Sequence, residues 1–118
     1  MKKITVIFRH APHGKANSRE ALDFALLSAS FEQVVTLLFV DDGVLNLLPN
    51  QTPAQIGGRD FISTFKALPL YDIEDVFVCE SSLTSMGLST QDCFIAVQAL
   101  SAEQIQQQLK QADEVLVY

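Results

Sequence analysis

The stretch VFVCESSLTSMGL, residues 76–88, indicates the fold class of this chain. Its first three residues and Cys79 form an uncharged apolar run, which predicts a buried strand. The run passes directly into a polar segment that predicts a short helix over residues 81–86, with Gly87 as its left-handed end. A buried strand that leads straight into a helix is typical of an α/β protein with a parallel sheet.

The sequence on both sides of this stretch repeats the alternation of strand and helix. Four further runs predict strands: residues 4–8 (ITVIF), 34–40 (VVTLLFV), 93–97 (CFIAV) and 114–118 (EVLVY). Helical patterns separate them at residues 18–30, 44–48, 58–68 and from Ser101 onward, where Ser101 and Gln104 have the spacing of a capping box. We therefore predict one domain over residues 1–118, a three-layer α/β/α fold with a parallel sheet of about five strands.

Composition limits the classes of function. The 118 residues carry a net charge of −6, and no basic patch is visible that could neutralise phosphates, so we expect no direct binding to nucleic acid. Hydrophobic residues make up 48% of the chain. Two interpretations of this value stay open: a sheet buried on both faces, or a subunit that hides part of its surface against a partner.

The sequence also predicts where the protein resides. Cys79 and Cys93 form no spaced disulfide framework and no CxxC pair, which suits a reducing cytosol. The apolar run after the basic start is too short for a signal peptide, and no stretch reaches the length of a membrane span. We expect a cytoplasmic protein without a membrane segment.

Chemistry in a parallel sheet collects beyond the carboxyl ends of the strands. The candidate site residues chosen by this rule are His10 and His13 after the first strand, Asp41 after the second, and Cys79, Ser81 and Ser82 at the third. Helix amides favour a thiolate at Cys79, whereas the neighbouring Glu80 opposes it, so a reactive and an inert cysteine are both open. Cys93 precedes the apolar residues FIAV and is interpreted as part of the core.

These residues are open to other interpretations. Cys79, a loop histidine and Asp41 could form a thiol hydrolase, although the pattern favours histidines in an exposed surface loop. The segment HAPHGKANS lies where a flavodoxin-like protein cradles a phosphate, but it has one glycine and matches no nucleotide motif. Asp41 and Asp42 could bind a cation, but Gly43 beside them indicates a turn and a helix cap instead. We expect neither a metal nor a cofactor.

Several segments resemble a known family. APHGKANSREALDFALLSAS, DDGVLNLLPNQTP and TFKALPLYDIEDVFVCESSLTSMGL are similar to the TusC/DsrF branch of the DsrE/DsrF/DsrH-like sulfur-relay family. The resemblance implies a subunit of a TusB–TusC–TusD hetero-hexamer that passes persulfide sulfur from a TusA-like donor to a TusE-like acceptor. That sulfur serves the 2-thiolation of the tRNA wobble uridine, and in the related Dsr complex it serves sulfur oxidation.

The resemblance also implies a role for the central cysteine. The position where the TusD/DsrE branch carries its persulfide cysteine corresponds to Cys79. In the TusC/DsrF branch the sulfur carrier is the neighbouring TusD-like chain. The resemblance therefore implies an accessory subunit, with a sulfurtransferase that uses Cys79 as persulfide carrier as the alternative.

Overall fold

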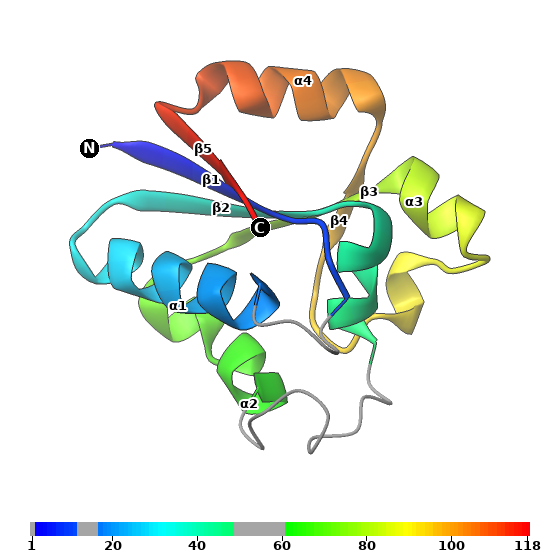
Figure 1. Ribbon diagram of the computed structural model, residues 1–118, viewed down its shortest axis with the longest axis horizontal. Helices are drawn as coiled ribbons and strands as arrows, with labels where there is room; N and C mark the ends of the chain where they lie inside the picture. The colour runs from blue at the N-terminus through cyan, green and yellow to red at the C-terminus, as the bar shows by residue number, and fades with distance from the viewer. Residues whose placement is uncertain (1, 12–16, 49–60) are drawn as a thin grey trace.

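The described residues build one parallel β-sheet. The computed structural model of the protein describes residues 2–11, 17–48 and 61–118. Five strands form the sheet in the order β4-β3-β2-β1-β5, and every neighbouring pair is parallel (Figure 1). The strands are β1 (Lys3–Phe8), β2 (Val34–Phe39), β3 (Asp75–Cys79), β4 (Gln98–Leu100) and β5 (Glu114–Val117). The predicted α/β fold with a five-stranded parallel sheet is confirmed.

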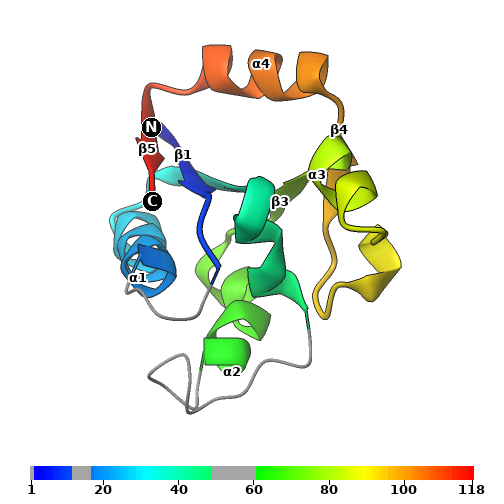
Figure 2. The ribbon, with the colours of Figure 1, turned by 45° about the vertical axis from the view of Figure 1, so that its right-hand side comes forward.

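Helices cover both faces of the sheet. On one face lie α1 (Asn17–Ser30), α2 (Phe61–Lys66) and the 3-10 turn η3 (Leu68–Tyr71), and on the other lies α4 (Ala102–Gln111) (Figure 1). At the carboxyl ends of the strands, the 3-10 helix η1 (Asp41–Leu47) contacts α3 (Glu80–Ser85) (Figure 2). These two short helices carry the candidate site.

Alternation along the strands divides the core into two clusters, since successive side chains of a strand point to opposite faces. The larger cluster packs against α1 and α2 and contains Phe8 and Phe39, whose rings stack with centroids 4.4 Å apart. The smaller one includes Ile7 and Leu38 and is covered by Ile105 of α4. The uncharged runs of β1 and β2 are thus buried on both faces.

The strand predicted at residues 93–97 is wrong: the fourth strand is β4, Gln98–Leu100, which begins beside Phe77 of β3. Ser89 and Asp92 form a reciprocal capping box that starts the 3-10 turn η4 (Thr90–Asp92). Immediately afterwards the Phe94 amide donates to the carbonyl of Leu47 at 2.9 Å. This bond holds the segment against η1 instead of β3, so Cys93 does not begin a strand.

Two helices differ in extent from their predictions. The helix predicted over residues 44–48 is the 3-10 helix η1, which begins earlier, at Asp41, and ends at Leu47. Of the helix predicted over residues 58–68, the described part is α2, and η3 follows it with Pro69 in its first turn; residues 58–60 lie outside the described residues. Pro69 lacks an amide hydrogen and is favoured in a first turn, which fits a new turn at this point.

The other local signals are present as predicted. Gly87 has φ +69° at the end of α3, the left-handed conformation expected there. Ser101 and Gln104 form the predicted capping box of α4: the Gln104 amide donates to Ser101 Oγ at 3.3 Å, and the Ser101 amide donates to Gln104 Oε1 at 2.9 Å. Within the described ranges, no helix combines the length and apolar character that a membrane crossing needs.

Candidate functional site

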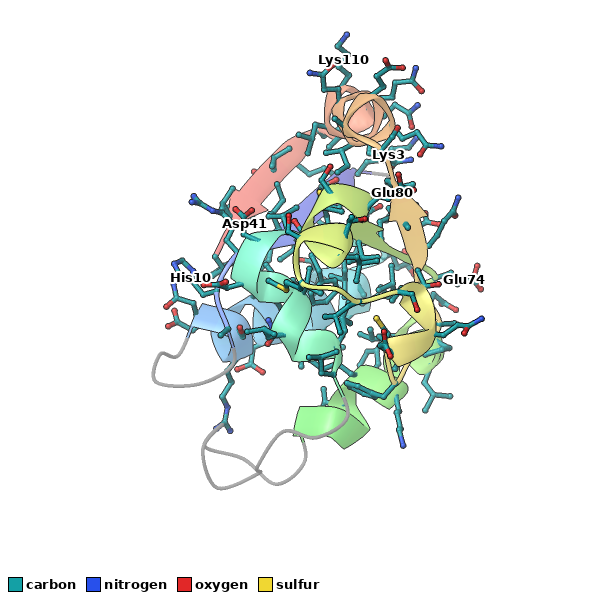
Figure 3. The ribbon with its side chains drawn as sticks, turned by 90° about the vertical axis from the view of Figure 1, so that its right-hand side faces the viewer. Lys3, His10, Asp41, Glu74, Glu80 and Lys110 are labelled. Carbon is teal, nitrogen blue, oxygen red and sulfur yellow. The ribbon has the colours of Figure 1, made fainter. Side chains whose placement is uncertain are left out.

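The candidate site lies at the carboxyl ends of β1, β2 and β3. Figure 3 looks onto this edge of the sheet and shows His10, Asp41 and Glu80 on the side that faces the viewer. Each follows a different strand, and the parallel pairing of β1 with β2 and of β2 with β3 brings the strand ends together. The sheet thus gathers residues that lie far apart in the sequence, as the rule for parallel sheets predicts.

Asp41 and Ser82 are joined directly. Asp41 has φ +49°, a left-handed conformation that is uncommon for a residue other than glycine. Its backbone amide donates to Ser82 Oγ at 2.9 Å, and Ser82 is itself buried. The bond fixes the start of η1 against α3, so two of the predicted site residues belong to one structural unit.

Cys79 is the last residue of β3 and the N-cap residue of α3. It pairs with Leu100 of β4 and is half-buried, with no side-chain capping bond. Within the same helix, Ser81 is exposed whereas Ser82 is buried. The thiol therefore stands at the junction of strand and helix, at the edge of the core.

His10 is anchored through its backbone. Its carbonyl accepts hydrogen bonds from Ser18 Oγ at 3.0 Å and from Asn46 Nδ2 at 2.9 Å. Its ring Nδ1 is buried and has no hydrogen-bond partner in the described structure. The backbone at the end of β1 is thus held by α1 and η1 together.

The hydrogen bond between nucleophile and base that a thiol hydrolase uses is absent from the described part of the site. In residues 2–11, 17–48 and 61–118, no hydrogen bond joins Cys79 to His10 or to Asp41. His13 lies outside the described residues. The hydrolase hypothesis stays a prediction. Among the candidate site residues in the described part of the chain, only Asp41 and Ser82 form a hydrogen bond with each other.

Asn46 is a site residue that the sequence analysis missed. It is 1% exposed, and its Nδ2 donates to the carbonyl of Gly43 at 2.8 Å as well as to that of His10. Gly43 lies so close to β1 that an added Cβ would stand 1.8 Å from the Phe8 carbonyl oxygen. The sequence contains one signal for this role: Asn46 is the single polar residue in the apolar run VLNLL. A polar side chain that is buried needs hydrogen-bond partners.

Cys93 is the residue that follows η4. It is half-buried and packs against the larger core cluster. Burial raises the pKa of the Cys93 thiol, and the neighbouring Asp92 carboxylate raises that pKa further. Both effects disfavour the thiolate. At neutral pH the Cys93 side chain is therefore mainly the protonated thiol, which is the less nucleophilic form.

The described residues contain no group of three or more His, Cys, Asp and Glu side chains arranged to hold a metal ion. This edge offers a thiol, two hydroxyls, carboxylates and the His10 imidazole (Figure 3). A thiolate here could attack the outer sulfur of a donor persulfide and release the donor thiolate, and the first amides of a helix stabilise the anion that results.

Comparisons with known proteins agree with this architecture. The model of the DsrE/DsrF-like family matches residues 2–118. A protein of Vibrio parahaemolyticus named "Protein TusC homolog" is 42% identical, and a protein of the same name from Aliivibrio fischeri is 37% identical; each alignment covers 100% of both chains. The crystal structure of the ychN protein from E. coli has the same fold, with a TM-score of 0.85, 23% identity and full coverage of both chains.

Proposed function

Because this chain belongs to the DsrE/DsrF-like family, we propose that it is a TusC-like subunit of a sulfur-relay complex. The observation that carries the proposal is the full-length similarity to two proteins named as TusC homologues, at 37% and 42% identity. Each alignment spans the whole of both chains. The segments LLPNQTP and LYDIE resemble the TusC/DsrF branch, and an unrelated α/β fold has no reason to share them.

In this proposal the chain assembles with TusB-like and TusD-like subunits into a cytoplasmic hetero-hexamer. The complex takes persulfide sulfur from a TusA-like donor and passes it to a TusE-like acceptor, for 2-thiolation of the tRNA wobble uridine. The subunit meets proteins and not the tRNA itself, which fits its net charge of −6. TusC-like segments favour this role over the sulfur-oxidation role of the Dsr branch.

Exposed apolar side chains support the role of a subunit. Leu27 in the last turn of α1 is 57% exposed, and Phe31 in the turn after this helix is 71% exposed. Leu70 of η3, an element that α1 contacts, is 85% exposed. Large apolar side chains that gather on a surface mark interaction sites and promote aggregation when left uncovered. A partner subunit that covers them would remove this hazard.

We assign Cys79 an accessory role in the relay. A carrier needs a nucleophilic thiolate whose terminal sulfur reaches a partner protein. Cys79 is half-buried. Glu80, the first residue of the helix that follows, places a negative charge beside the thiol, which disfavours the thiolate. The alternative, in which Cys79 itself carries the persulfide, is favoured by its place at the first amides of α3.

Co-expression with TusB-like and TusD-like chains, followed by native mass spectrometry, tests the proposal. We expect a hetero-hexamer that contains this chain. The isolated chain should associate with itself, because the apolar surface of α1 and η3 is then uncovered. A chain that is strictly monomeric at high concentration and binds neither partner would refute the proposal.

A further inference from the structure

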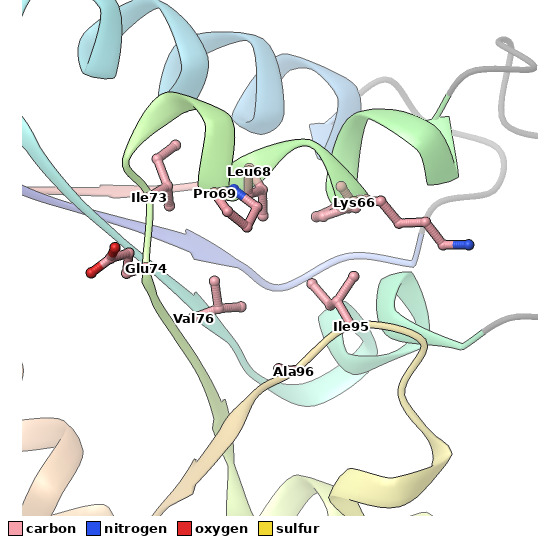
Figure 4. Close-up of a pocket in the computed structure, with 9 residues that line it drawn as sticks. Lys66, Leu68, Pro69, Ile73, Glu74, Val76, Ile95 and Ala96 are labelled. Atoms are coloured by element: carbon pink, nitrogen blue, oxygen red, sulfur yellow. The ribbon is translucent and has the colours of Figure 1, made fainter.

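An open groove runs along the outer edge of β3, on the side of β4. Its apolar half is a cavity of about 340 Å³ that lies between α2, η3, β3 and the segment before β4. The lining includes Leu68, Pro69, Ile73, Val76 and Ile95 (Figure 4). A second hollow of about 210 Å³ continues from it between residues 74–77 and 96–98. Glu74, Val76 and Ala96 line both, so the two hollows form one groove.

The groove exists because β4 begins late. β3 pairs with β2 from Asp75 onward, but with β4 only from Phe77 onward. The segment that precedes β4 is held against η1 by the bond from the Phe94 amide to the Leu47 carbonyl. The sheet is therefore open on one side of Asp75 and Val76, which is the kind of edge to which an extended chain adds.

The groove has an apolar end and an acidic end. In Figure 4 the charged ends of Lys66 and Glu74 point away from the apolar cavity, which leaves its walls apolar. Glu74 and Asp75 are both exposed beside the second hollow, and neither forms an ion pair within the described ranges. An occupant that complements this surface carries an apolar group next to a positive charge.

We propose that this groove binds a short extended segment of a partner protein, with a large aliphatic side chain in the cavity and a Lys or Arg against Glu74 and Asp75. A strand rises about 3.3 Å per residue, so the open edge accommodates about two or three residues of the segment. The cavity is at the small end of the range for ligand sites, about 300–1,000 Å³, which suits one side chain better than a cofactor. Backbone groups supply affinity in this binding mode, and the side-chain pocket supplies selectivity.

Charge argues against a second copy of this chain as the occupant. The other free edge of the sheet is β5, where Glu114 follows Asp113; Lys2 pairs with Glu114 at 3.4 Å, so this edge carries two carboxylates against one ammonium group. Its addition to the groove would place like charges beside Glu74 and Asp75, which is unfavourable. A basic segment from a different protein meets no such repulsion. Cys79 lines neither hollow, so this proposal does not depend on the role of Cys79.

The test uses a displayed library of random heptapeptides selected on the full chain. Ala96→Leu fills the groove from an exposed position that borders both hollows. Ala102→Leu is the matched control, since Ala102 is exposed at the start of α4 on the other face of the sheet. A second pair compares Glu74→Gln with Glu103→Gln, an exposed carboxylate of α4.

We expect enrichment of peptides that place Leu, Ile or Val beside Lys or Arg. Ala96→Leu should weaken the binding of a synthetic peptide of the enriched sequence by about tenfold or more, because the new leucine side chain occupies the anchor pocket. Ala102→Leu should leave the affinity for this peptide unchanged. Glu74→Gln should weaken it about twofold to fivefold, and Glu103→Gln should have no effect. Amide shifts in a titration followed by nuclear magnetic resonance should centre on residues 74–77 and 95–98.

Three results would overturn the proposal: no enriched peptide, enriched peptides that bind the Ala96→Leu variant as tightly as the parent chain, or amide shifts elsewhere. Sedimentation equilibrium of the same variants tests the competing occupant. If Ala96→Leu abolishes self-association that Ala102→Leu leaves intact, a second copy occupies the groove and the basic peptide does not.

Discussion

The backbone amide of Asp41 donates a hydrogen bond to Ser82 Oγ at 2.9 Å, across 41 positions of sequence. The bond links the first residue of η1, the 3-10 helix that follows β2, to the helix that follows β3. Asp41 adopts φ +49° at this point, a conformation that its surroundings must stabilise. Cys79 stands at the start of the same helix, so the bond helps to hold the thiol in place.

Ser82→Ala should destabilise the fold by about 1–2 kcal/mol, because the Asp41 amide loses its partner. The free energy of unfolding, measured in urea, checks this value. Ser81→Ala is the matched control: Ser81 is exposed in the same helix and should change stability by less than about 0.5 kcal/mol. Equal effects of the two substitutions would show that the Asp41–Ser82 bond is unimportant.

Gly43→Ala should be far more damaging than Gly87→Ala. A Cβ on Gly43 would lie 1.8 Å from the backbone oxygen of Phe8, so η1 must move away from β1, at a cost of about 3 kcal/mol or more. Gly87 has φ +69° but open space around it, and only backbone strain of about 1–2 kcal/mol is expected. Thermal unfolding of both variants gives the comparison, and equal midpoints would contradict the close approach of η1 to β1.

The two cysteines should differ in reactivity. Both are half-buried. Burial and the Asp92 carboxylate raise the pKa of Cys93, which reduces its thiolate fraction at neutral pH. Cys79 should therefore be alkylated first by a soluble reagent in the folded chain, as read by peptide mapping. Labelling of Cys93 before Cys79 would reverse this assignment.

The pH dependence of the Cys93 reaction follows from the same shift. A raised pKa moves the thiolate to higher pH, so the alkylation rate of Cys93 should rise only above the pH at which an ordinary cysteine reacts. Asp92→Asn removes the negative charge, while its side-chain oxygen can still accept from the Ser89 amide. This variant should shift the Cys93 profile to lower pH, and an unchanged profile would show that Asp92 has no influence.

Cys79→Ser tests the assignment of an accessory role. Serine is nearly isosteric, so the proposed hexamer should assemble with the variant. The rate at which the purified complex transfers labelled persulfide sulfur to a TusE-like acceptor should fall by less than about tenfold. Loss of an obligatory nucleophile costs far more, on the order of 10⁴-fold to 10⁶-fold, because a hydroxyl forms no persulfide. Complete loss with an intact hexamer would make Cys79 a relay cysteine.

Local patterns in the sequence were sufficient for most of the fold. The apolar runs of β1, β2, β3 and β5, the left-handed Gly87 and the capping box of Ser101 with Gln104 are all present. Each depends on residues close together in the chain, and propensity and periodicity are properties of such short windows. The resemblance to the family likewise rested on contiguous segments.

Tertiary contacts decided the fourth strand and the detail of the site. The run CFIAV has the composition of a strand, but the bond from Phe94 to Leu47 places it against η1, and β4 starts at Gln98 instead. Asn46 bonds to the His10 carbonyl across 36 positions, and Asp41 to Ser82 across 41. No local pattern records such pairs, because they form only when the sheet brings the strand ends together. The groove beside β3 has the same origin, since it is the space left by the late start of β4.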